Sequence, residues 1–561
     1  MAQLAESILA ALDDEQRAVA TAVRGPVCVI AGAGTGKTRA ITHRLAYAVD
    51  IGVIEPQKIL ALTFTARAAG EMRSRLRALG VPTISARTFH AAALRQLMYF
   101  WPEVLGGRFP QLLTSKTGFI TEAINRAGIA AIKSQNVLRD LAAEIEWSKV
   151  LGYAPDTYAE SAETFNRGII SGNSRLPYAD IAKVYEAYES LKRQERAIDF
   201  EDVLLLTVGM LEEDRLVRDR IRDQYRYFTV DEYQDVSPLQ QRLLDLWVGG
   251  RQDLCVVGDP AQTIYSFAGA TPAFLLNFTQ RYPDAEVIRL NRGYRSTPEI
   301  INTANALLRT TLASHELTAQ GTHGEKPLVI SAEGSEHETH TIVEMISSAI
   351  NDGVIPHEIA VLARTNNQID ALESALNKSG IENQIRSAER FFDQIEVRDL
   401  MRAVRNASVL SVAGGDWYSD LKSALQPFGE SKYVRTFLHL GRELMQEGVN
   451  SLRGFLRELE DRAEQNNPPT MPGVVLSTLH AAKGLEWDQV FLIGAAEGTL
   501  PYLTSYSGSK NPGSKNPGSN EHSIDEERRL FYVGITRAKR RLTISYSGTP
   551  SRFLVESGFY Q

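Results

Sequence analysis

A glycine-rich turn between an apolar strand and a helix constrains this chain more than any other segment. Residues 26–30 (PVCVI) form a short apolar run, residues 31–38 (AGAGTGKT) follow it, and residues 38–49 show the pattern of an amphipathic helix. A strand, a glycine-rich loop ending in Gly-Lys-Thr and a helix, in this order, form the context of a phosphate-binding loop. The chain is therefore expected to bind nucleotide phosphates at this loop.

The residue types in the loop suit that chemistry. Gly34 and Gly36 let backbone N–H groups curl around the phosphates, Lys37 reaches the β and γ phosphates, and the Thr38 hydroxyl can ligate magnesium. The loop departs from the general pattern at its first position, where Ala31 replaces glycine. A glycine-rich turn is often only a turn, but the preceding strand and the following helix make phosphate binding the stronger interpretation.

An acidic motif follows a later apolar run. Residues 227–230 (YFTV) lead into residues 231–235 (DEYQD), which places carboxylates at the C-terminal end of a strand, where α/β sheets bind ligands. Asp231 is expected to hold magnesium, and Glu232 to orient and deprotonate an attacking water. An acidic strand end is commonly only a solvated turn, so this interpretation depends on the phosphate-binding loop.

Phosphoryl transfer also requires positive charge near the γ-phosphate, and an inserted arginine accelerates it by roughly 10³ to 10⁵. Two candidates lie in short motifs far from the loop: Arg295 in residues 291–297 (NRGYRST) and Arg537 in residues 533–539 (VGITRAK). By themselves these residues do not differ from surface arginines.

The length of the chain requires several domains. Its 561 residues exceed the roughly 250 to 300 that one core supports. Short apolar runs alternate with helical patterns, which favours parallel α/β sheets, whereas residues from about 96 to 195 and from 400 to 472 are mainly helical. The predicted architecture is two α/β domains, each interrupted by a helical subdomain. Their predicted bounds are 1–95 with 196–280 for the first and 281–399 with 473–561 for the second.

Composition limits the function less than the motifs do. The net charge of −7 does not indicate a nucleic-acid partner. No apolar run approaches the roughly 20 residues that cross a bilayer, and the acidic N-terminus does not resemble a signal peptide, so a cytoplasmic protein that does not bind membranes is expected. Cys28 and Cys255 lie in β-branched runs and cannot build a structural metal site. The Gly-Ser-Asn-Pro repeat at 507–520 is expected to be a disordered surface loop.

Four further segments complete an ordered series of motifs: residues 12–16 (LDDEQ), 256–262 (VVGDPAQ), 478–486 (TLHAAKGLE) and 526–538 (EERRLFYVGITRA). The series resembles that of the superfamily 1 helicases of the UvrD, PcrA and Rep group over essentially the whole chain. The resemblance implies an α/β fold with two RecA-like P-loop motor domains that use ATP and Mg²⁺. It also implies mainly helical insertion subdomains, 1B at 96–195 and a short 2B at 400–472.

The resemblance implies a role for each residue near ATP. Catalytic roles fall to Glu232, Gln262, Arg295 and Arg537, with Gln262 sensing the γ-phosphate that both arginines meet. Gln16 would read the adenine edge, Tyr294 would stack on the adenine, and Glu486 would approach the ribose. The implied nucleotide contacts are Gln16, Ala31, Gly32, Ala33, Gly34, Thr35, Gly36, Lys37, Thr38, Arg39, Tyr294 and Glu486, with Thr38 and Asp231 on magnesium.

The implied partner is single-stranded DNA and its junctions with duplex. The implied DNA contacts are Phe64, Thr65, Thr88, His90, Tyr265, Phe267, Arg364, Asn366, Thr478 and His480. Aromatic rings suit this role because they stack on any base for roughly 1–3 kcal/mol each. For Phe89, in the same segment as Thr88, core packing and DNA contact remain equally open.

The sequence also departs from the family pattern. Phe267-Ala268 stands where the family usually has Trp-Arg, and Ala66-Arg67 stands where it has Asn-Lys. Only 84 residues separate residues 391–393 from the 478–486 motif, so the duplex-contacting 2B subdomain is expected to be abbreviated. Relatives with a short second insertion sometimes carry further C-terminal modules, so the native chain could continue beyond residue 561.

The resemblance implies an ATP-dependent 3′–5′ DNA helicase and translocase, a monomer or weak dimer, acting in repair or replication. The alternatives are a DNA-stimulated ATPase that translocates with little unwinding, and the motor of a larger repair complex. A nucleotide-gated DNA-binding protein without turnover is disfavoured by intact Glu232 and Gln262. Residues alone do not separate DNA from RNA.

Overall fold

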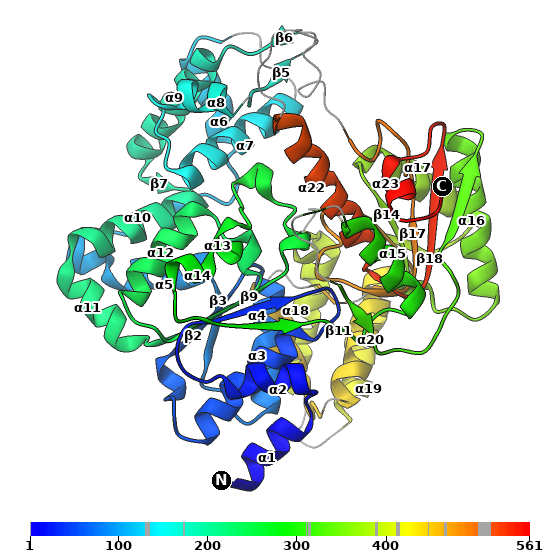
Figure 1. Ribbon diagram of the computed structural model, residues 1–561, viewed down its shortest axis with the longest axis horizontal. Coiled ribbons are helices and arrows are strands. Elements are labelled where there is room, and N and C mark those ends of the chain that lie inside the picture. The colour runs from blue at the N-terminus through cyan, green and yellow to red at the C-terminus, as the bar shows by residue number, and fades with distance from the viewer. Residues whose placement is uncertain are drawn as a thin grey trace.

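The computed structural model contains two six-stranded parallel sheets and two separate helical bundles (Figure 1). It describes residues 2–129, 135–165, 167–171, 174–309, 311, 316–386, 391–410, 416–446, 448–464, 468–469, 471–502 and 518–560. Residues 507–517 of the predicted surface loop lie outside this part, and residues 518–520 begin a helix. None of the described helices is long and apolar enough to cross a membrane.

The first sheet has the strand order β10-β1-β9-β8-β2-β3, and every neighbouring pair is parallel. Its strands are β10 (Glu286–Leu290), β1 (Val27–Ala31), β9 (Leu254–Gly258), β8 (Tyr227–Val230), β2 (Ile59–Thr63) and β3 (Ser85–Thr88). Apolar runs buried on both faces are typical of parallel strands covered by helices on each side. Cys28 and Cys255 are buried free thiols that contribute to the cores on opposite faces of this sheet.

Helices cover both faces of the first sheet. One face packs against α1 (Ala2–Ala10), α2 (Asp14–Thr21), α3 (Lys37–Asp50) and α4 (Ala66–Ala78). The other packs against α5 (Phe89–Val104), α10 (Phe200–Glu213), α11 (Arg215–Gln224), α12 (Pro238–Val248), α13 (Ala273–Leu276) and α14 (Phe278–Arg281). Both sets leave the C-terminal ends of the strands free for the loops that carry the motifs.

The second sheet has the strand order β13-β18-β17-β14-β16-β15 and is also parallel throughout. Its strands are β13 (Leu328–Ala332), β18 (Ala538–Ser547), β17 (Trp487–Leu492), β14 (Ile359–Ala363), β16 (Val474–Thr478) and β15 (Asn383–Arg386). Its helices are α16 (Ser335–Asn351) and α17 (Asn366–Lys378) on one face, and α15 (Pro298–Leu308), α22 (Gly518–Ile535) and α23 (Arg552–Glu556) on the other.

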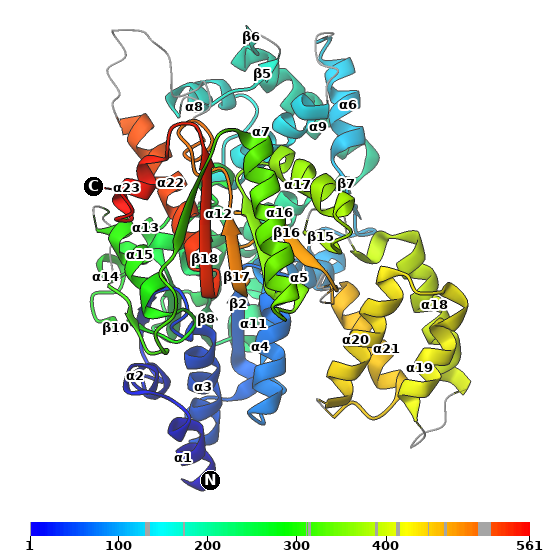
Figure 2. The ribbon, with the colours of Figure 1, turned by 90° about the vertical axis from the view of Figure 1, so that its right-hand side faces the viewer.

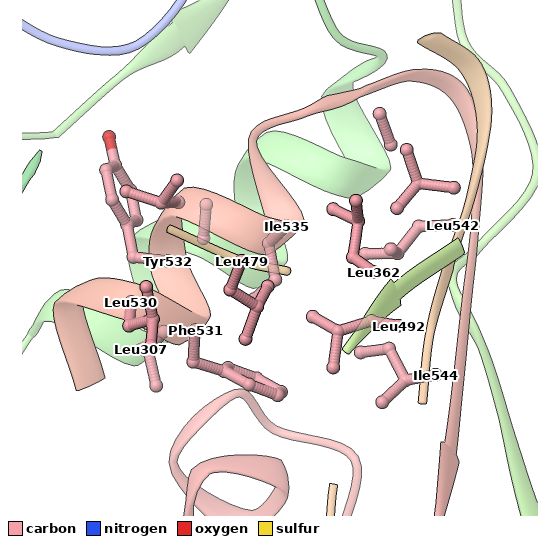
Figure 3. Close-up of a cluster of buried hydrophobic side chains, with 14 of the residues drawn as sticks. Leu307, Leu362, Leu479, Leu492, Leu530, Phe531, Tyr532, Ile535, Leu542 and Ile544 are labelled. Atoms are coloured by element: carbon pink, nitrogen blue, oxygen red, sulfur yellow. The ribbon is translucent and has the colours of Figure 1, made fainter. Parts of the chain in front are cut away.

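The core between the second sheet and α22 joins the two halves of the molecule. Phe531 and Ile535 of α22 pack over strand residues such as Leu492 (Figure 3). The same cluster includes Ala33 and Ala261, which belong to loops of the first sheet. The two sheets therefore share buried apolar surface at the edge where the motifs lie.

Each helical bundle has its own core. The first bundle comprises α6 (Thr117–Arg126), α7 (Gln135–Leu151), α8 (Tyr158–Thr164) and α9 (Tyr178–Glu195), with the hairpin β5 (Ile170–Ser171) and β6 (Ser174–Arg175). The second comprises α18 (Ile395–Leu410), α19 (Trp417–Leu425), α20 (Lys432–Gln446) and α21 (Leu452–Glu464). The first bundle lies at the top and the second in the lower part of both views (Figures 1 and 2). Short parallel pairs join β4 (Gln111–Leu112) to β7 (Ala197–Ile198) and β11 (Arg292–Gly293) to β12 (Thr318–Ala319).

Three predicted boundaries differ from the structure. Residue 96 falls inside α5, whose buried side chains belong to the core of the first sheet. The first sheet continues beyond residue 280, because β10 pairs with β1. The second bundle begins at Ile395 with α18 rather than at 400. Composition could not locate these boundaries, because α5 has the same helical pattern as the insertion and an apolar strand does not reveal which sheet it joins.

Candidate nucleotide and nucleic-acid site

The loop after β1 requires glycine at two positions. The strand ends at Ala31, α3 begins at Lys37, and Gly34 and Gly36 have φ of 74° and 79°. A Cβ on Gly34 would lie 2.7 Å from the Cβ of Arg295, and one on Gly36 would lie 2.6 Å from Nε2 of Gln16. Side chains are therefore excluded by both the backbone conformation and the close approach. The N-terminus of α3 follows the loop directly, and the N-terminus of a helix is a favourable site for an anion.

The carboxylates after β8 face the start of α3. Lys37 Nζ lies 3.4 Å from Glu232 Oε1, and the Thr38 hydroxyl lies 3.5 Å from Asp231 Oδ2. Burial and the neighbouring Glu232 raise the pKa of Asp231. Burial opposes ionisation of Glu232 as well, but Lys37, Lys483 and the hydrogen bond from Gln234 together outweigh it and lower the pKa of Glu232. The site therefore holds Glu232 as a carboxylate paired with the loop lysine.

The oxygen pair of Thr38 and Asp231 suits magnesium. A hydroxyl and a carboxylate are the hard ligands that Mg²⁺ prefers, and this ion usually takes one or two protein ligands with water and phosphate oxygens completing an octahedron. The backbone N–H of Glu232 donates to Asp231 Oδ1 (2.9 Å), which fixes that carboxylate. Glu232 itself has φ of 53°, an uncommon conformation for a residue with a side chain, and it turns the chain beside the loop.

Two arginines from distant segments converge on this loop. Arg537 is buried and donates to Gln262 Oε1 (3.3 Å) and to the Leu485 carbonyl (3.0 Å). Burial and the nearby Arg295 lower the pKa of Arg537 to about 9. Arg295 donates to Glu486 Oε2 (2.5 Å) and to the Thr536 carbonyl (3.1 Å). The two predicted arginines thus lie side by side, next to the phosphate-binding loop.

The residues expected near the adenine and ribose surround the same loop. Gln16 is buried and donates to the Thr35 carbonyl (3.0 Å). Arg39 donates to the carbonyl of Ala11 (2.5 Å). The Tyr294 backbone N–H donates to the Gly34 carbonyl (2.9 Å), while its half-exposed ring ends in a hydroxyl bonded to Asp13. Glu486 pairs with Arg295 and also lies 3.6 Å from Lys539.

Gln262 belongs to a network that the sequence did not reveal. Its amide donates to Asp259 Oδ2 (2.6 Å), and the Asp259 backbone N–H donates to Gln234 Oε1 (2.9 Å). Gln234 in turn donates to Glu232 Oε2 (2.5 Å). Lys483 reaches this network from the second sheet. Gln234 and Lys483 lie inside motifs that the sequence identifies, at residues 231–235 and 478–486. Their partners, however, are shown only by the fold.

Four rings form a row along the motif edge of both sheets. Phe64 stacks on Tyr265 with centroids 5.2 Å apart and an interplanar angle of 17°. Phe267 meets Tyr265 and His480 edge to face, at 6.1 and 5.8 Å. Phe267 is 51% exposed and Phe64 is 38% exposed. Burial and the neighbouring Arg364 lower the pKa of His480 to about 4, so it is neutral at pH 7. Four of the predicted ring contacts, Phe64, Tyr265, Phe267 and His480, are therefore one connected group.

The predicted polar DNA contacts lie at the starts of helices or at the ends of strands. The hydroxyls of Thr65 and Thr88 accept the backbone N–H groups of Ala68 and Ala91, both at 3.1 Å, and cap α4 and α5. Thr478 ends β16, and Asn366 is the first residue of α17. Arg364 forms a two-pronged ion pair with buried Glu527 and lies 5.1 Å over the Tyr502 ring. Its partner Glu527 was not predicted.

His90 lies apart from the row of rings. It lines a cavity of about 760 Å³ between α5, α10 and the first bundle, and its ring meets Phe200 edge to face. Burial and Lys116 lower the pKa of His90 to about 4. Phe89, for which core packing and DNA contact were both open, is a core residue: it is 3% exposed and stacks on Trp247. The basic residues near 528–541 are mostly engaged with protein, as with Arg528 on Glu556.

Comparisons with known proteins identify the family to which this chain belongs. The model of the UvrD/REP helicase N-terminal domain matches residues 12–283, and that of the UvrD-like helicase C-terminal domain matches residues 288–408 and 422–549. The ATP-dependent DNA helicase UvrD2 of Mycobacterium tuberculosis, and that of Mycobacterium bovis, are each 43% identical over 595 residues, covering 99% of this chain and 82% of the relative. The ATP-dependent DNA helicase PcrA of Staphylococcus epidermidis is 26% identical over 654 residues, covering 97% and 86%. The chain therefore belongs to the UvrD/REP helicase family, with both its N-terminal and its C-terminal domains.

Proposed function

We propose that this protein is an ATP-dependent DNA helicase that moves 3′ to 5′ along single-stranded DNA and unwinds duplex, in DNA repair or replication. The observation that carries the proposal is the convergence of Arg295 and Arg537, from the side of the second sheet, on the phosphate loop of the first. A triphosphate bound there would connect the two halves. Movement of one half against the other could then follow each hydrolysis.

Residues of the first sheet would bind the substrate and begin the reaction. Lys37 would bind the β and γ phosphates, and Thr38 and Asp231 would hold Mg²⁺, which neutralises phosphate charge when bound. Phosphate binding competes for Lys37, which releases Glu232 from its ion pair and makes it a stronger base. Glu232 would take a proton from water as the water oxygen bonds to the γ-phosphorus and the bond to the ADP oxygen breaks.

The other half would complete the site. Arg295 and Arg537 would stabilise the charge on the transferred phosphoryl group, and Gln262, bonded to Arg537, would report the γ-phosphate to the loop that carries Tyr265.

Tyr294 would stack on the adenine, Gln16 and Arg39 would lie beside it, and Glu486 would approach the ribose once Arg295 turns to the phosphate. The backbone of residues 31–36 would surround the phosphates.

DNA would pass along the rings and the cations at the motif edge. Phe64, Tyr265 and Phe267 would stack on bases, which suits a motor that must accept any sequence. Arg364 would contact the backbone, with Asn366, Thr478 and His480 nearby in the second half, and Thr65, Thr88 and His90 in the first. Such a protein could act as a monomer or weak dimer.

The runner-up is a translocase with little intrinsic unwinding, alone or within a larger repair complex. Two observations favour it: Phe267-Ala268 offers neither the larger ring nor the cation that the family usually has, and the second bundle has only four helices within its described residues. Opening duplex costs about 1.4 kcal/mol per base-pair step, so movement does not guarantee unwinding.

The test is unwinding of matched duplexes with a 3′ tail, a 5′ tail or blunt ends, beside a translocation assay on single strands. The proposal expects ATP-dependent unwinding of the 3′-tailed duplex alone. Translocation without unwinding would favour the runner-up. Unwinding only from a 5′ tail would contradict the polarity, and equal activity with RNA tails would contradict the DNA preference.

A further inference from the structure

Lys483, from the second half, contacts two residues of the first half. It lies in the turn after β16, and its side chain is 8% exposed. Its ammonium lies 2.5 Å from Asp235 Oδ2 and donates to the Gln262 carbonyl at 2.5 Å. Lys483 therefore contacts both the acidic motif at residues 231–235 and the loop that carries Gln262 and Tyr265.

The partner of Lys483 is a fully buried carboxylate one turn from the proposed general base. The Asp235 side chain is 0% exposed, and among the described residues Lys483 is its one salt-bridge partner while its Oδ1 has no hydrogen bond. Gln234 Nε2 lies 3.5 Å from Asp235 Oδ2 and 2.5 Å from Glu232 Oε2. A buried charge that loses its partner is strongly destabilised, so Asp235 must follow the ammonium.

The same ammonium also faces the row of rings. It lies 5.0 Å from the centroid of Tyr265, within the range of a cation–π interaction. Tyr265 stacks on Phe64, and its hydroxyl donates to the His480 carbonyl (3.4 Å). The three N–H donors of one lysine are thus divided among a carboxylate, a backbone carbonyl and a ring.

We propose that Lys483 is a positioning residue that links the stacking of a base on Tyr265 to the placement of Glu232, through Asp235 and Gln234. The inference rests on the proposed function, because it requires DNA at the rings and ATP at the loop. When a base takes up the face of Tyr265 and shifts the ring, the ammonium changes its orientation. Asp235 and Gln234 then move with it, and Glu232 gains the position from which it activates water. DNA-stimulated hydrolysis follows from this chain of contacts.

The rival explanation is a structural tether. Lys483 would then hold the two halves together equally in the presence and absence of DNA, and its loss would lower both rates by one factor. The two explanations differ in the ratio of DNA-stimulated to DNA-free turnover, and not in the rate itself.

The experiment measures kcat and KM for ATP with and without saturating oligo(dT), for the full chain and for Lys483→Met, Lys483→Arg and Tyr265→Leu. Lys483→Met is expected to lower the stimulation ratio by about tenfold, the upper part of the range for one cation–π contact. Lys483→Arg, which keeps the charge, is expected to recover part of the ratio. Lys422→Met is the matched control, because Lys422 lies 4.8 Å over the Tyr418 ring in the second bundle, away from both sites.

The double variant Lys483→Met with Tyr265→Leu tests the link itself. Residues that act in one chain are not additive, so the double variant is expected to lose no more of the stimulation ratio than the worse single variant. Additive losses, or an unchanged ratio in Lys483→Met, would overturn the inference. If Lys483→Met fails to fold in thermal unfolding, Lys483→Arg decides, because it keeps a positive charge beside Asp235 while altering the contact with Tyr265, and it must still lower the ratio below that of the wild-type chain. A wild-type chain without DNA stimulation would contradict the proposed function and not this link alone.

Discussion

The two sheets use the same backbone turn to present opposite chemistry. In the first, β2 is followed by Phe64 and Thr65, and α4 then begins; in the second, β14 is followed by Arg364 and Thr365, and α17 then begins. Both strands have five fully buried residues, and each threonine occupies the N-cap position. The residue before the threonine is a ring in one half and a guanidinium in the other. A shared scaffold therefore presents a stacking group and an ionic group along one edge.

The halves differ more at the nucleotide. The first has a glycine loop after β1, whose backbone and Lys37 are arranged for phosphate. The second contributes Arg537, held between α22 and β18 by the carbonyls of Val533 and Leu485. In the proposed mechanism one half binds the nucleotide and the other completes the positive charge around it, so neither half is expected to hydrolyse ATP efficiently alone. Three predictions test this division, the difference between the ring and the guanidinium, and the turn that the two sheets share.

The largest expected effect separates binding from hydrolysis. Arg537→Ala should lower kcat by roughly 10³ or more, because a positive charge on the transferred phosphoryl group is lost, while ATP affinity changes much less. Lys37→Ala should lower both. Phosphate release and titration with a fluorescent ATP analogue measure the two quantities.

Arg541→Ala is the control for Arg537→Ala, because Arg541 pairs with Glu325 at the surface. If Arg537→Ala weakened ATP binding as strongly as hydrolysis, the proposed division between the halves would be wrong.

The prediction of intermediate size distinguishes the DNA contact of the Phe64 ring from that of the Arg364 guanidinium. Phe64→Leu should weaken binding of single-stranded DNA by about 1–3 kcal/mol with an unchanged salt dependence, because stacking releases no counterions. Arg364→Met should reduce the magnitude of the negative slope of log K against log salt by about 0.7, the value for one phosphate contact on a single strand. Fluorescence anisotropy across a salt series measures both.

Phe165→Leu provides the control for the ring, since Phe165 is exposed in the first bundle beyond the motif edge. An altered salt slope in Phe64→Leu would contradict the assignment of chemistry to each half.

The smallest effect concerns the turn itself. Thr65→Val should lower the free energy of unfolding by about 1 kcal/mol, because the Ala68 N–H at the start of α4 loses its cap. Thr121→Val, which removes only an exposed hydroxyl bonded to the Thr117 carbonyl within α6, should cost less. Urea denaturation of both variants checks the difference. Equal losses would show that the cap is not what orders this turn.

Part of this fold follows from local pattern. The loop at 31–38, the strand at 227–230 and the α/β class were predictable, because a buried parallel strand is a short apolar run and a phosphate loop has fixed glycines. Domain edges were less predictable, because α5 has an amphipathic pattern that suits either neighbour and β10 is just another short strand. For Phe89, the sequence left core and DNA contact equally open, and packing against Trp247 decided the question.

The sequence by itself determined the chemical groups and their local frame: a lysine at the start of α3, adjacent carboxylates at a strand end, and threonines that begin helices. Those features depend on neighbours within a few residues. Tertiary structure alone decided which distant groups meet, such as Lys483 with Asp235, Arg364 with Glu527 and Arg537 with Gln262. Each of these pairs is separated by more than 150 residues, and their contact depends on how two sheets pack through a shared core, which no local pattern specifies.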